Sequence, residues 1–155
     1  MIDYQRLYHT GVRVPDLDAA MDEIGASLGV TWASVVTNPG QQVWTPEDGL
    51  QEVPLRFTYS CEGPQHIELL EGAPGSVWDG RQAPGVHHVG VWVDDVAVET
   101  TRLLDAGWAL RAAQAPPEQG YGVLTYVQPP AGMLVELVWS VVAARFEQWW
   151  AGGSL

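Results

Sequence analysis

The segment Tyr-His-Thr-Gly-Val-Arg-Val-Pro-Asp-Leu, residues 8–17, recurs as His-His-Val-Gly-Val-Trp-Val-Asp-Asp-Val, residues 87–96. At an offset of 79 residues, five of the ten aligned positions are identical: His9 and His88, Gly11 and Gly90, Val12 and Val91, Val14 and Val93, Asp16 and Asp95. Self-similarity of this kind is the signature of a repeated structural unit. The sequence therefore predicts two copies of one module.

Each copy is predicted to begin with a strand followed by a helix. β-Branched residues alternate with other residue types over about six positions, and Asp16 or Asp95 then offers a helix N-cap. Apolar residues recur at helical spacing from Leu17 to Leu28 and from Val96 to Ala106. A glycine follows each of these segments and is expected to end the helix.

Three strand-like runs follow each helix: residues 31–37, 55–60 and 66–70, and then residues 108–112, 121–128 and 133–139. Both halves are thus predicted β-α-β-β-β modules within one domain, residues 1–155: module 1 over about 6–71, module 2 over about 86–139, and a C-terminal helical tail over 140–155. The stretch 38–54 is rich in Pro, Gly and Gln, and we expect a long loop there that covers a site.

The composition excludes several classes of function. No apolar run among the 155 residues is long enough to cross a bilayer, and the N-terminus shows no export signal. Cys61 is the single cysteine, which rules out an internal disulfide and favours a cytoplasmic location. The net charge of −12 repels phosphate backbones and anionic membranes, so neither nucleic acid nor a membrane is an expected partner.

Four side chains of metal-ligand type lie at repeated positions. The predicted last strands match, His-Ile-Glu-Leu-Leu against Leu-Val-Glu-Leu-Val, so Glu68 pairs with Glu136 as His9 pairs with His88. Alone, each such Glu is more often a surface residue or half of an ion pair. Two buried carboxylates in apolar strands need compensation, and two imidazoles with two carboxylates suit a divalent ion in open octahedral geometry.

The other histidines and the tryptophans receive weaker assignments. We expect His87 to face away from His88 and to serve in packing. His66 lies two residues before Glu68 on the same strand face and is expected near the site, where it is a candidate substrate-binding residue. Most of the eight tryptophans are expected to pack the core or a dimer, whereas Trp92, on the strand face of His88, is a candidate to line an apolar pocket.

These residues resemble the vicinal oxygen chelate superfamily, which includes glyoxalase I, methylmalonyl-CoA epimerase, extradiol dioxygenases and antibiotic-resistance proteins. The resemblance implies an α+β fold in which paired βαβββ modules form a curved, barrel-like mixed sheet around a metal site. Its ligands fall on the first and last strand of each module. Here those positions are His9, Glu68, His88 and Glu136.

Two segments resemble particular members of that superfamily. Gly-Val-His-His-Val, residues 85–89, is similar to methylmalonyl-CoA epimerase, in which the second His is the ligand; this favours His88 over His87. His-Thr-Gly-Val-Arg-Val, residues 9–14, is similar to glyoxalase I, in which the Arg helps to hold the substrate. That likeness implies that Arg13 binds substrate.

The resemblance implies an enzyme that holds one divalent ion: Ni, Co, Mn, Zn or Fe. The first expectation is an isomerase or epimerase that abstracts a proton next to a metal-bound carbonyl through an enolate, with Glu136 or Glu68 as base. A glyoxalase I-type lyase, a ring-cleaving dioxygenase and a non-catalytic antibiotic-binding protein are the alternatives. The expected substrate is a small molecule with adjacent oxygens and an apolar body.

A homodimer is also expected. Members of the superfamily commonly dimerise, and an apolar helical stripe follows the second module: Val142, Phe146, Trp149 and Trp150. Packing of this tail on its own sheet is the alternative.

Overall fold

The computed structural model describes residues 2–155. The first half contains β1 (Leu7–Arg13), α1 (Leu17–Leu28), β2 (Val36–Thr45), β3 (Gly49–Tyr59) and β4 (His66–Gly72). The second half contains β5 (Gly85–Val93), α2 (Val96–Asp105), β6 (Ala109–Ala113), β7 (Leu124–Gln128), β8 (Val135–Trp139) and α3 (Ala143–Trp150). No helix within residues 2–155 is long and apolar enough to cross a membrane.

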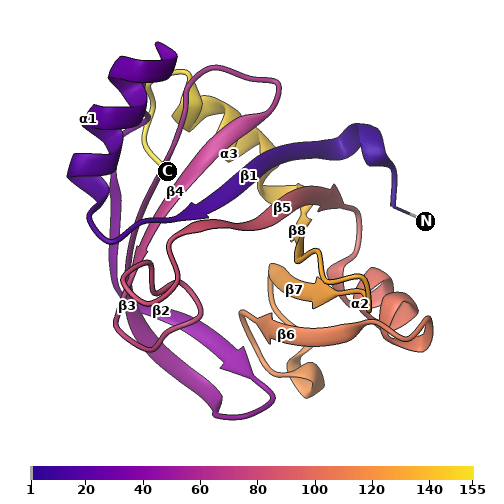
Figure 1. Ribbon diagram of the computed structural model, residues 1–155. Coiled ribbons are helices and arrows are strands. Elements are labelled where there is room, and N and C mark those ends of the chain that lie inside the picture. The colour runs from indigo at the N-terminus through magenta and orange to yellow at the C-terminus, as the bar shows by residue number, and fades with distance from the viewer. Residues whose placement is uncertain (1) are drawn as a thin grey trace.

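The strands form one closed barrel in the order β1-β4-β3-β2-β6-β7-β8-β5 (Figure 1). The pairs β1–β4 and β5–β8 are parallel, and the other pairs are antiparallel. The halves join along the extended β1–β5 ladder and at one β2–β6 pair, Trp44 with Ala113. The two modules therefore pair within one chain, and the predicted α+β fold with a barrel-like mixed sheet is confirmed.

Local signals placed the first two helices well. The side chain of Asp16 accepts a hydrogen bond from the Ala19 amide at 2.9 Å, and Asp95 accepts one from the Val98 amide at the same distance. Both caps satisfy an amide that the first helical turn leaves without a partner. Gly29 ends α1 with a φ of 70°, a left-handed conformation that suits glycine.

The predicted loop over residues 38–54 is wrong. Most of this stretch forms the β2–β3 hairpin, which projects from the lower part of the barrel in Figure 1. The ladder has an irregularity between Asn38 and Gln41, and Pro39 and Gly40 lie there, where strict pairing is not required. The hairpin turns over residues 46–48, and Gly49, whose φ is 71°, follows the turn as the first residue of β3. The Pro and Gly content thus marked a bulge and a turn inside a hairpin.

The strand predicted over residues 31–37 is also largely wrong, because β2 begins only at Val36. Before that point the chain makes a single bridge, between Trp32 and Ser60. The indole of Trp32 donates a hydrogen bond to the Met21 carbonyl at 2.9 Å and packs against α1. Before Val36, this segment therefore covers α1 through Trp32 and Val35, and only Val36 and Thr37 take part in the ladder.

The C-terminal tail packs on its own barrel. Trp149 is fully buried, and its indole N–H contacts both the carbonyl and the hydroxyl of Ser34 at 3.0 and 2.9 Å. Val142, Phe146 and Trp150 join the same apolar cluster. The stripe that suggested a dimer is thus used inside the chain, and the homodimer stays a prediction.

Candidate metal centre

Strand register brings the repeated histidines and glycines together inside the barrel. In the antiparallel β1–β5 ladder, His9 lies opposite Gly90 and Gly11 lies opposite His88. Residues two apart on a strand share a face, so each half contributes one imidazole and one glycine to the same surface. The pattern His-x-Gly, present in both copies of the repeat, therefore builds one nearly symmetric site.

The glycines give the imidazoles their space. A Cβ added at Gly11 would overlap the ring of His88, and one added at Gly90 would overlap the ring of His9. Both positions are far inside the 3.0 Å approach that real Cβ atoms essentially never make. Each histidine thus lies over the glycine of the opposite module, which explains why His and Gly recur together.

The parallel strand pairs add the carboxylates. Glu68 on β4 is the register partner of Gly11, and Glu136 on β8 is the partner of Gly90. Each glutamate therefore lies beside the glycine whose other neighbour is the histidine of the opposite half. The four side chains, which we call the His-Glu quartet, are all buried: His9, Glu68, His88 and Glu136.

The ligand atoms of the quartet converge. The two Nε2 atoms lie 2.8 Å apart. His9 Nε2 lies 3.3 Å from Glu68 Oε2 and 3.2 Å from Glu136 Oε2, and the matching distances from His88 Nε2 are 3.2 and 3.4 Å. Atoms about 2.1 Å from a common ion lie about 3.0 Å apart at neighbouring octahedral corners. The spacing of the quartet fits one divalent ion.

Two further observations support this fit. Glu68 Oε2 is buried and has no hydrogen-bond partner within the part of the chain that the structure describes. A buried carboxylate without compensation is expensive, and a cation would provide that compensation. All four residues are also of the types that divalent transition metals accept as ligands.

Without a metal, the quartet would hold protons on its imidazoles. Burial alone lowers the pKa of His88, but the adjacent carboxylates of Glu136 and Glu68 outweigh burial and raise this pKa to about 9. The pKa of His9 is raised by the same balance. Burial alone raises the pKa of Glu136, but the adjacent His88 and His9 bring it below its usual value. The carboxylates therefore stay ionised.

This balance predicts opposite pH responses of the stripped and metal-loaded protein. The pKa of His88 is about 9 in the folded protein, against an ordinary value of 6.5, so the stabilisation from this group is complete below about 6.5 and is lost as the pH rises through about 9. Metal needs the deprotonated imidazole. We expect the Tm of stripped protein to fall over this range while that of loaded protein holds or rises. A flat profile for stripped protein would contradict the assignment.

His87 does not face away from His88, so that expectation is wrong. In the β1–β5 ladder Gly11 pairs with His88 but Val12 pairs with Val86, which leaves His87 as the extra residue of a bulge. The alternation of faces therefore breaks, and His87 Nδ1 lies 3.0 Å from His88 Nδ1. Burial first, and then the charges of His88 and Arg13, lower the pKa of His87 to about 3. His87 is thus neutral and can accept a hydrogen bond.

We expect His87→Phe to weaken metal binding by about 10-fold to 100-fold. A ligating His normally donates its second ring N–H to a partner that fixes its orientation, and His87 Nδ1 is placed to accept from His88 Nδ1–H. His87→Asn should keep most of the affinity, because its amide oxygen can replace Nδ1. Metal competition titrations measure both variants. Equal affinity of the Phe variant and the unaltered protein would exclude this role.

The repeat counterpart of His87 is Tyr8, and it is bulged in the same way. Leu7 pairs with Val91 and His9 pairs with Gly90, so Tyr8 has no partner on β5. Its ring lies 4.3 Å from that of His9. Each half thus places the residue before its histidine against that histidine.

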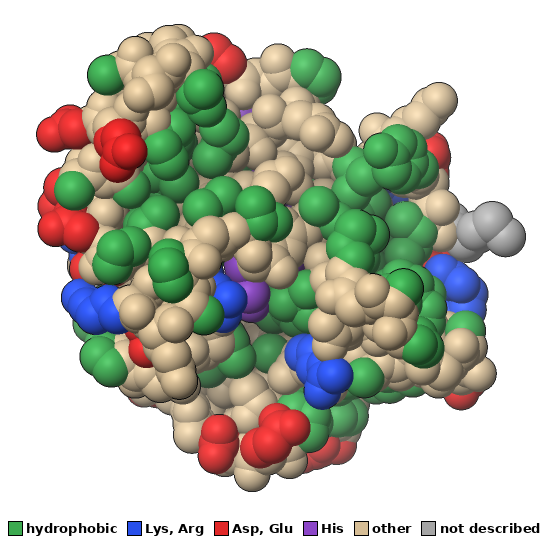
Figure 2. All heavy atoms as spheres, in the orientation of Figure 1, with side chains coloured by type: hydrophobic (Ala, Val, Ile, Leu, Met, Phe, Trp, Pro, Cys, Tyr) green, Lys and Arg blue, Asp and Glu red, His purple; other side chains and the backbone are tan. Residues whose placement is uncertain are grey.

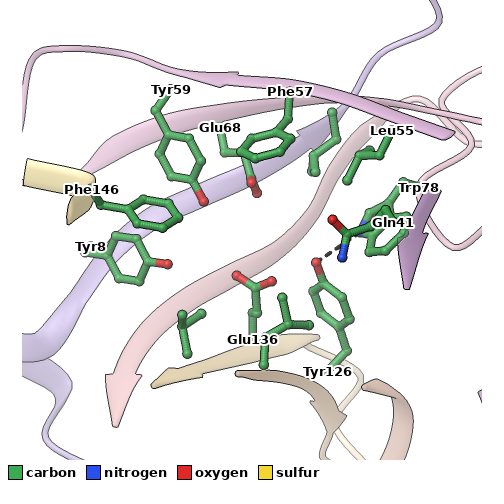
Figure 3. A pocket seen from close by; sticks show the side chains of 13 residues that line it. Tyr8, Gln41, Leu55, Phe57, Tyr59, Glu68, Trp78, Tyr126, Glu136 and Phe146 are labelled. Carbon is green, nitrogen blue, oxygen red and sulfur yellow. Dashed lines mark hydrogen bonds between the residues drawn. The ribbon is translucent and has the colours of Figure 1, made fainter. Parts of the chain in front are cut away.

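A cavity of about 80 Å³ lies next to the carboxylates of the quartet. Its wall contains six aromatic side chains, four aliphatic ones, one amide and the two glutamates: Tyr8, Phe57, Tyr59, Trp78, Tyr126, Phe146, Leu55, Leu70, Leu124, Val138, Gln41, Glu68 and Glu136. The hydroxyls of Tyr8, Tyr59 and Tyr126 point into the same space as the carboxylates (Figure 3). His9 and His88 are not among the lining residues. Only the carboxylates of the quartet therefore face the cavity.

Two of these tyrosines are a repeated feature that the sequence analysis missed. Tyr59 on β3 is the register partner of Glu68, and Tyr126 on β7 is the partner of Glu136. The Tyr126 hydroxyl accepts a hydrogen bond from the Trp78 indole N–H at 3.0 Å. Its own proton is then directed away from Trp78. A tyrosine in the third strand of both modules was the available signal.

The three predicted substrate-binding residues lie outside the cavity wall. Trp92 stacks on Tyr8, with ring centroids 3.7 Å apart. His66 stacks on Trp150 at 3.8 Å, and its Nδ1 lies 2.7 Å from the Ser60 carbonyl. Arg13 donates a long hydrogen bond, 3.4 Å, to the Val77 carbonyl. In each case the partner is another residue of the protein and not the cavity, so the substrate-binding roles of Trp92, His66 and Arg13 stay predictions.

The sequence matches a known protein family, and the fold resembles several solved structures. The profile described as "Glyoxalase/Bleomycin resistance protein/Dioxygenase superfamily" matches residues 8–125. No curated protein matches the sequence. Among solved structures, a Streptomyces coelicolor methylmalonyl-CoA epimerase variant in complex with 2-nitronate-propionyl-CoA matches with a TM-score of 0.58 and 23% identity. That match covers 86% of this chain and 95% of that one.

Two other solved structures are similar. Methylmalonyl-CoA epimerase from Mycobacterium tuberculosis matches with a TM-score of 0.56 and 19% identity, over 93% of this chain and 97% of that one. A hypothetical protein from Bacillus halodurans matches with a TM-score of 0.61 and 19% identity, over 85% and 91%. At these identities the likeness is one of fold.

Proposed function

The chain belongs to the glyoxalase/bleomycin resistance protein/dioxygenase superfamily, and from this premise we propose that it is a divalent-metal-dependent isomerase or epimerase. The reaction abstracts a proton next to a carbonyl group and returns it. The observation that carries this proposal is the buried His-Glu quartet, whose ligand atoms converge and whose two carboxylates face a cavity.

Different side chains of the site are assigned different roles in the reaction. A divalent ion held by the quartet supplies Lewis acidity, which makes a C–H next to a carbonyl easier to deprotonate. The imidazoles of His9 and His88 would hold the ion, and they do not line the cavity. Glu68 and Glu136 do reach it, so one of them takes the proton and gives it back. The aromatic wall excludes water that would compete for that proton.

The first test is metal content. The quartet supplies one set of ligands, so purified protein is expected to hold about one divalent ion per chain. Elemental analysis after separate reconstitution with Ni, Co, Mn, Zn and Fe measures this number. Less than about a tenth of an equivalent with every metal would refute the metal site.

The second test is hydrogen exchange on a substrate. A 2-substituted thioester or a 2-oxo compound is incubated in D₂O, and mass spectrometry follows deuterium entry at the acidic carbon. The expected result is exchange by metal-loaded protein and none by stripped protein. Loaded protein that exchanges no member of either compound class would count against the reaction while leaving the metal site intact.

A glyoxalase I-type lyase is the second candidate, because it would use the same proton abstraction. The similarity of residues 9–14 to glyoxalase I favours it. A ring-cleaving dioxygenase would use two His and one carboxylate, and the convergence of Glu68 as a fourth ligand disfavours it. A non-catalytic binding protein would leave all four convergent ligands unexplained.

A further inference from the structure

The positive charges of this protein are few and mostly neutralised. The sequence has seven arginines and no lysine against nineteen acidic residues. Four arginines form ion pairs with carboxylates: Arg6 with Asp94, Arg56 with Asp18 and Glu71, Arg81 with Glu71, and Arg102 with Glu99. Arg13, Arg111 and Arg145 form none within residues 2–155, and they lie on different elements, β1, β6 and α3.

The face of the molecule shown in Figure 2 has no continuous basic surface. On the face shown in Figure 2, the blue side chains appear as separate spots between apolar and acidic ones. Phosphate groups are normally bound by clusters of Arg and Lys or by backbone amides at helix starts. A ligand with several phosphates would therefore meet a protein whose net charge is −12 without a matching patch on this face.

The cavity also lacks positively charged side chains. None of its lining residues is basic. Two carboxylates face it, and even with a divalent ion on the quartet they cancel the ion's charge. An additional anionic group inside would meet no positively charged side chain among the lining residues, and burying it would be costly.

The cavity wall does offer groups for uncharged oxygens. The Tyr126 hydroxyl accepts from Trp78 and lies beside the Glu136 carboxylate. The other polar groups of the wall, apart from the two glutamates, include the uncharged hydroxyls of Tyr8 and Tyr59 and the amide of Gln41. The remaining surface is mainly aromatic and aliphatic. The volume of about 80 Å³ is well below the roughly 300 Å³ at which ordinary ligand pockets begin. Only a small group fits.

We propose that the substrate is a compact, uncharged molecule, and not a coenzyme A thioester. This inference rests on the proposed function, because it names the substrate class of that site. It separates this chain from the Streptomyces coelicolor epimerase of the same fold, which was solved with a CoA ester.

The test compares two thioesters that carry the same 2-substituted acyl group, one on coenzyme A and one on uncharged N-acetylcysteamine. Isothermal titration calorimetry on metal-loaded protein measures both affinities at about 20 and about 200 mM salt. We expect the uncharged ester to bind at least about 10-fold more tightly at low salt, with no salt dependence. Binding of the CoA ester should improve with salt, because screening weakens the repulsion.

Two results would overturn this substrate class: tighter or equal binding of the CoA ester with affinity that falls as salt rises, or no binding of the uncharged ester. Deuterium exchange on the same two esters reads the reaction separately. Preferential binding of the uncharged ester without exchange would keep the substrate class and reject the proposed reaction.

A variant pair locates the binding. Gln41 lines the cavity, whereas its neighbour Gln42 on β2 is exposed. Gln41→Trp should fill the space and weaken binding of the uncharged ester by about 10-fold or more, while the matched Gln42→Trp should leave it unchanged. Equal affinities of the two variants would place the ligand elsewhere and overturn the assignment of this cavity.

Discussion

Gly90→Ala is expected to abolish metal binding while leaving the barrel folded. The new methyl group would occupy the space of the His9 imidazole, so the ring must leave the quartet. The loss of one ligand from a four-ligand set should lower metal affinity by at least about 100-fold, more than the loss of an outer partner. Overpacking should cost stability by only about 1–3 kcal/mol. Elemental analysis and circular dichroism measure the two effects separately.

The repeat supplies a second variant and a control. Gly11→Ala should act in the same way through His88, because the two glycines are equivalent. Gly40→Ala on β2 is the matched control: a Cβ there would meet nothing closer than Glu52 Oε2 at 3.5 Å. Retention of a full equivalent of metal by Gly90→Ala would show that the quartet does not have the described geometry in solution.

The predictable part of the fold rests on local signals and on the repeat. Asp16 and Asp95 cap their helices as expected because an N-cap depends only on the next three residues. The duplicated His-x-Gly segment established that two equivalent modules exist. Periodicity alone would not have shown which strands pair. The family resemblance implied a barrel-like mixed sheet but not the strand order, which only the structure gives.

The errors arise where pairing between distant strands decides the structure. The β2–β3 hairpin is held by cross-strand bonds that tolerate Pro39 and Gly40 at an irregularity, whereas composition alone favours a loop. Tyr8 and His87 turn toward their neighbouring histidines because the β1–β5 register skips one residue on each strand. A bulge is a property of two strands together, so neither segment read by itself reveals it.

The residues of the site were also predictable only in part. His9, Glu68, His88 and Glu136 were predictable because they occupy repeated positions, and the structure brings all four together. The cavity wall was not predictable, since it combines side chains from the hairpin, the linker between the modules and α3: Gln41, Trp78 and Phe146. Such a combination becomes visible only after the barrel closes.

The second large effect is expected on proton transfer to and from the substrate. Glu136→Gln is expected to retain most of the metal and to lower deuterium exchange by about 100-fold or more, the usual cost of a lost general base. The amide of Gln has nearly the same shape and keeps an oxygen near His9 and His88, 3.2 and 3.4 Å from their Nε2 atoms in the present carboxylate. It cannot accept a proton in the relevant pH range.

Geometry restricts this role to two candidates, because within the quartet only Glu68 and Glu136 reach the cavity. Glu68→Gln is therefore the paired variant, and the one that loses more exchange at equal metal content identifies the principal base. If the two act on opposite faces of the substrate, each variant should still exchange one enantiomer and not the other, as expected for an epimerase with two bases. If both variants exchange deuterium as fast as the unaltered protein, neither glutamate is the base, and the proton must pass to water or to another group of the cavity.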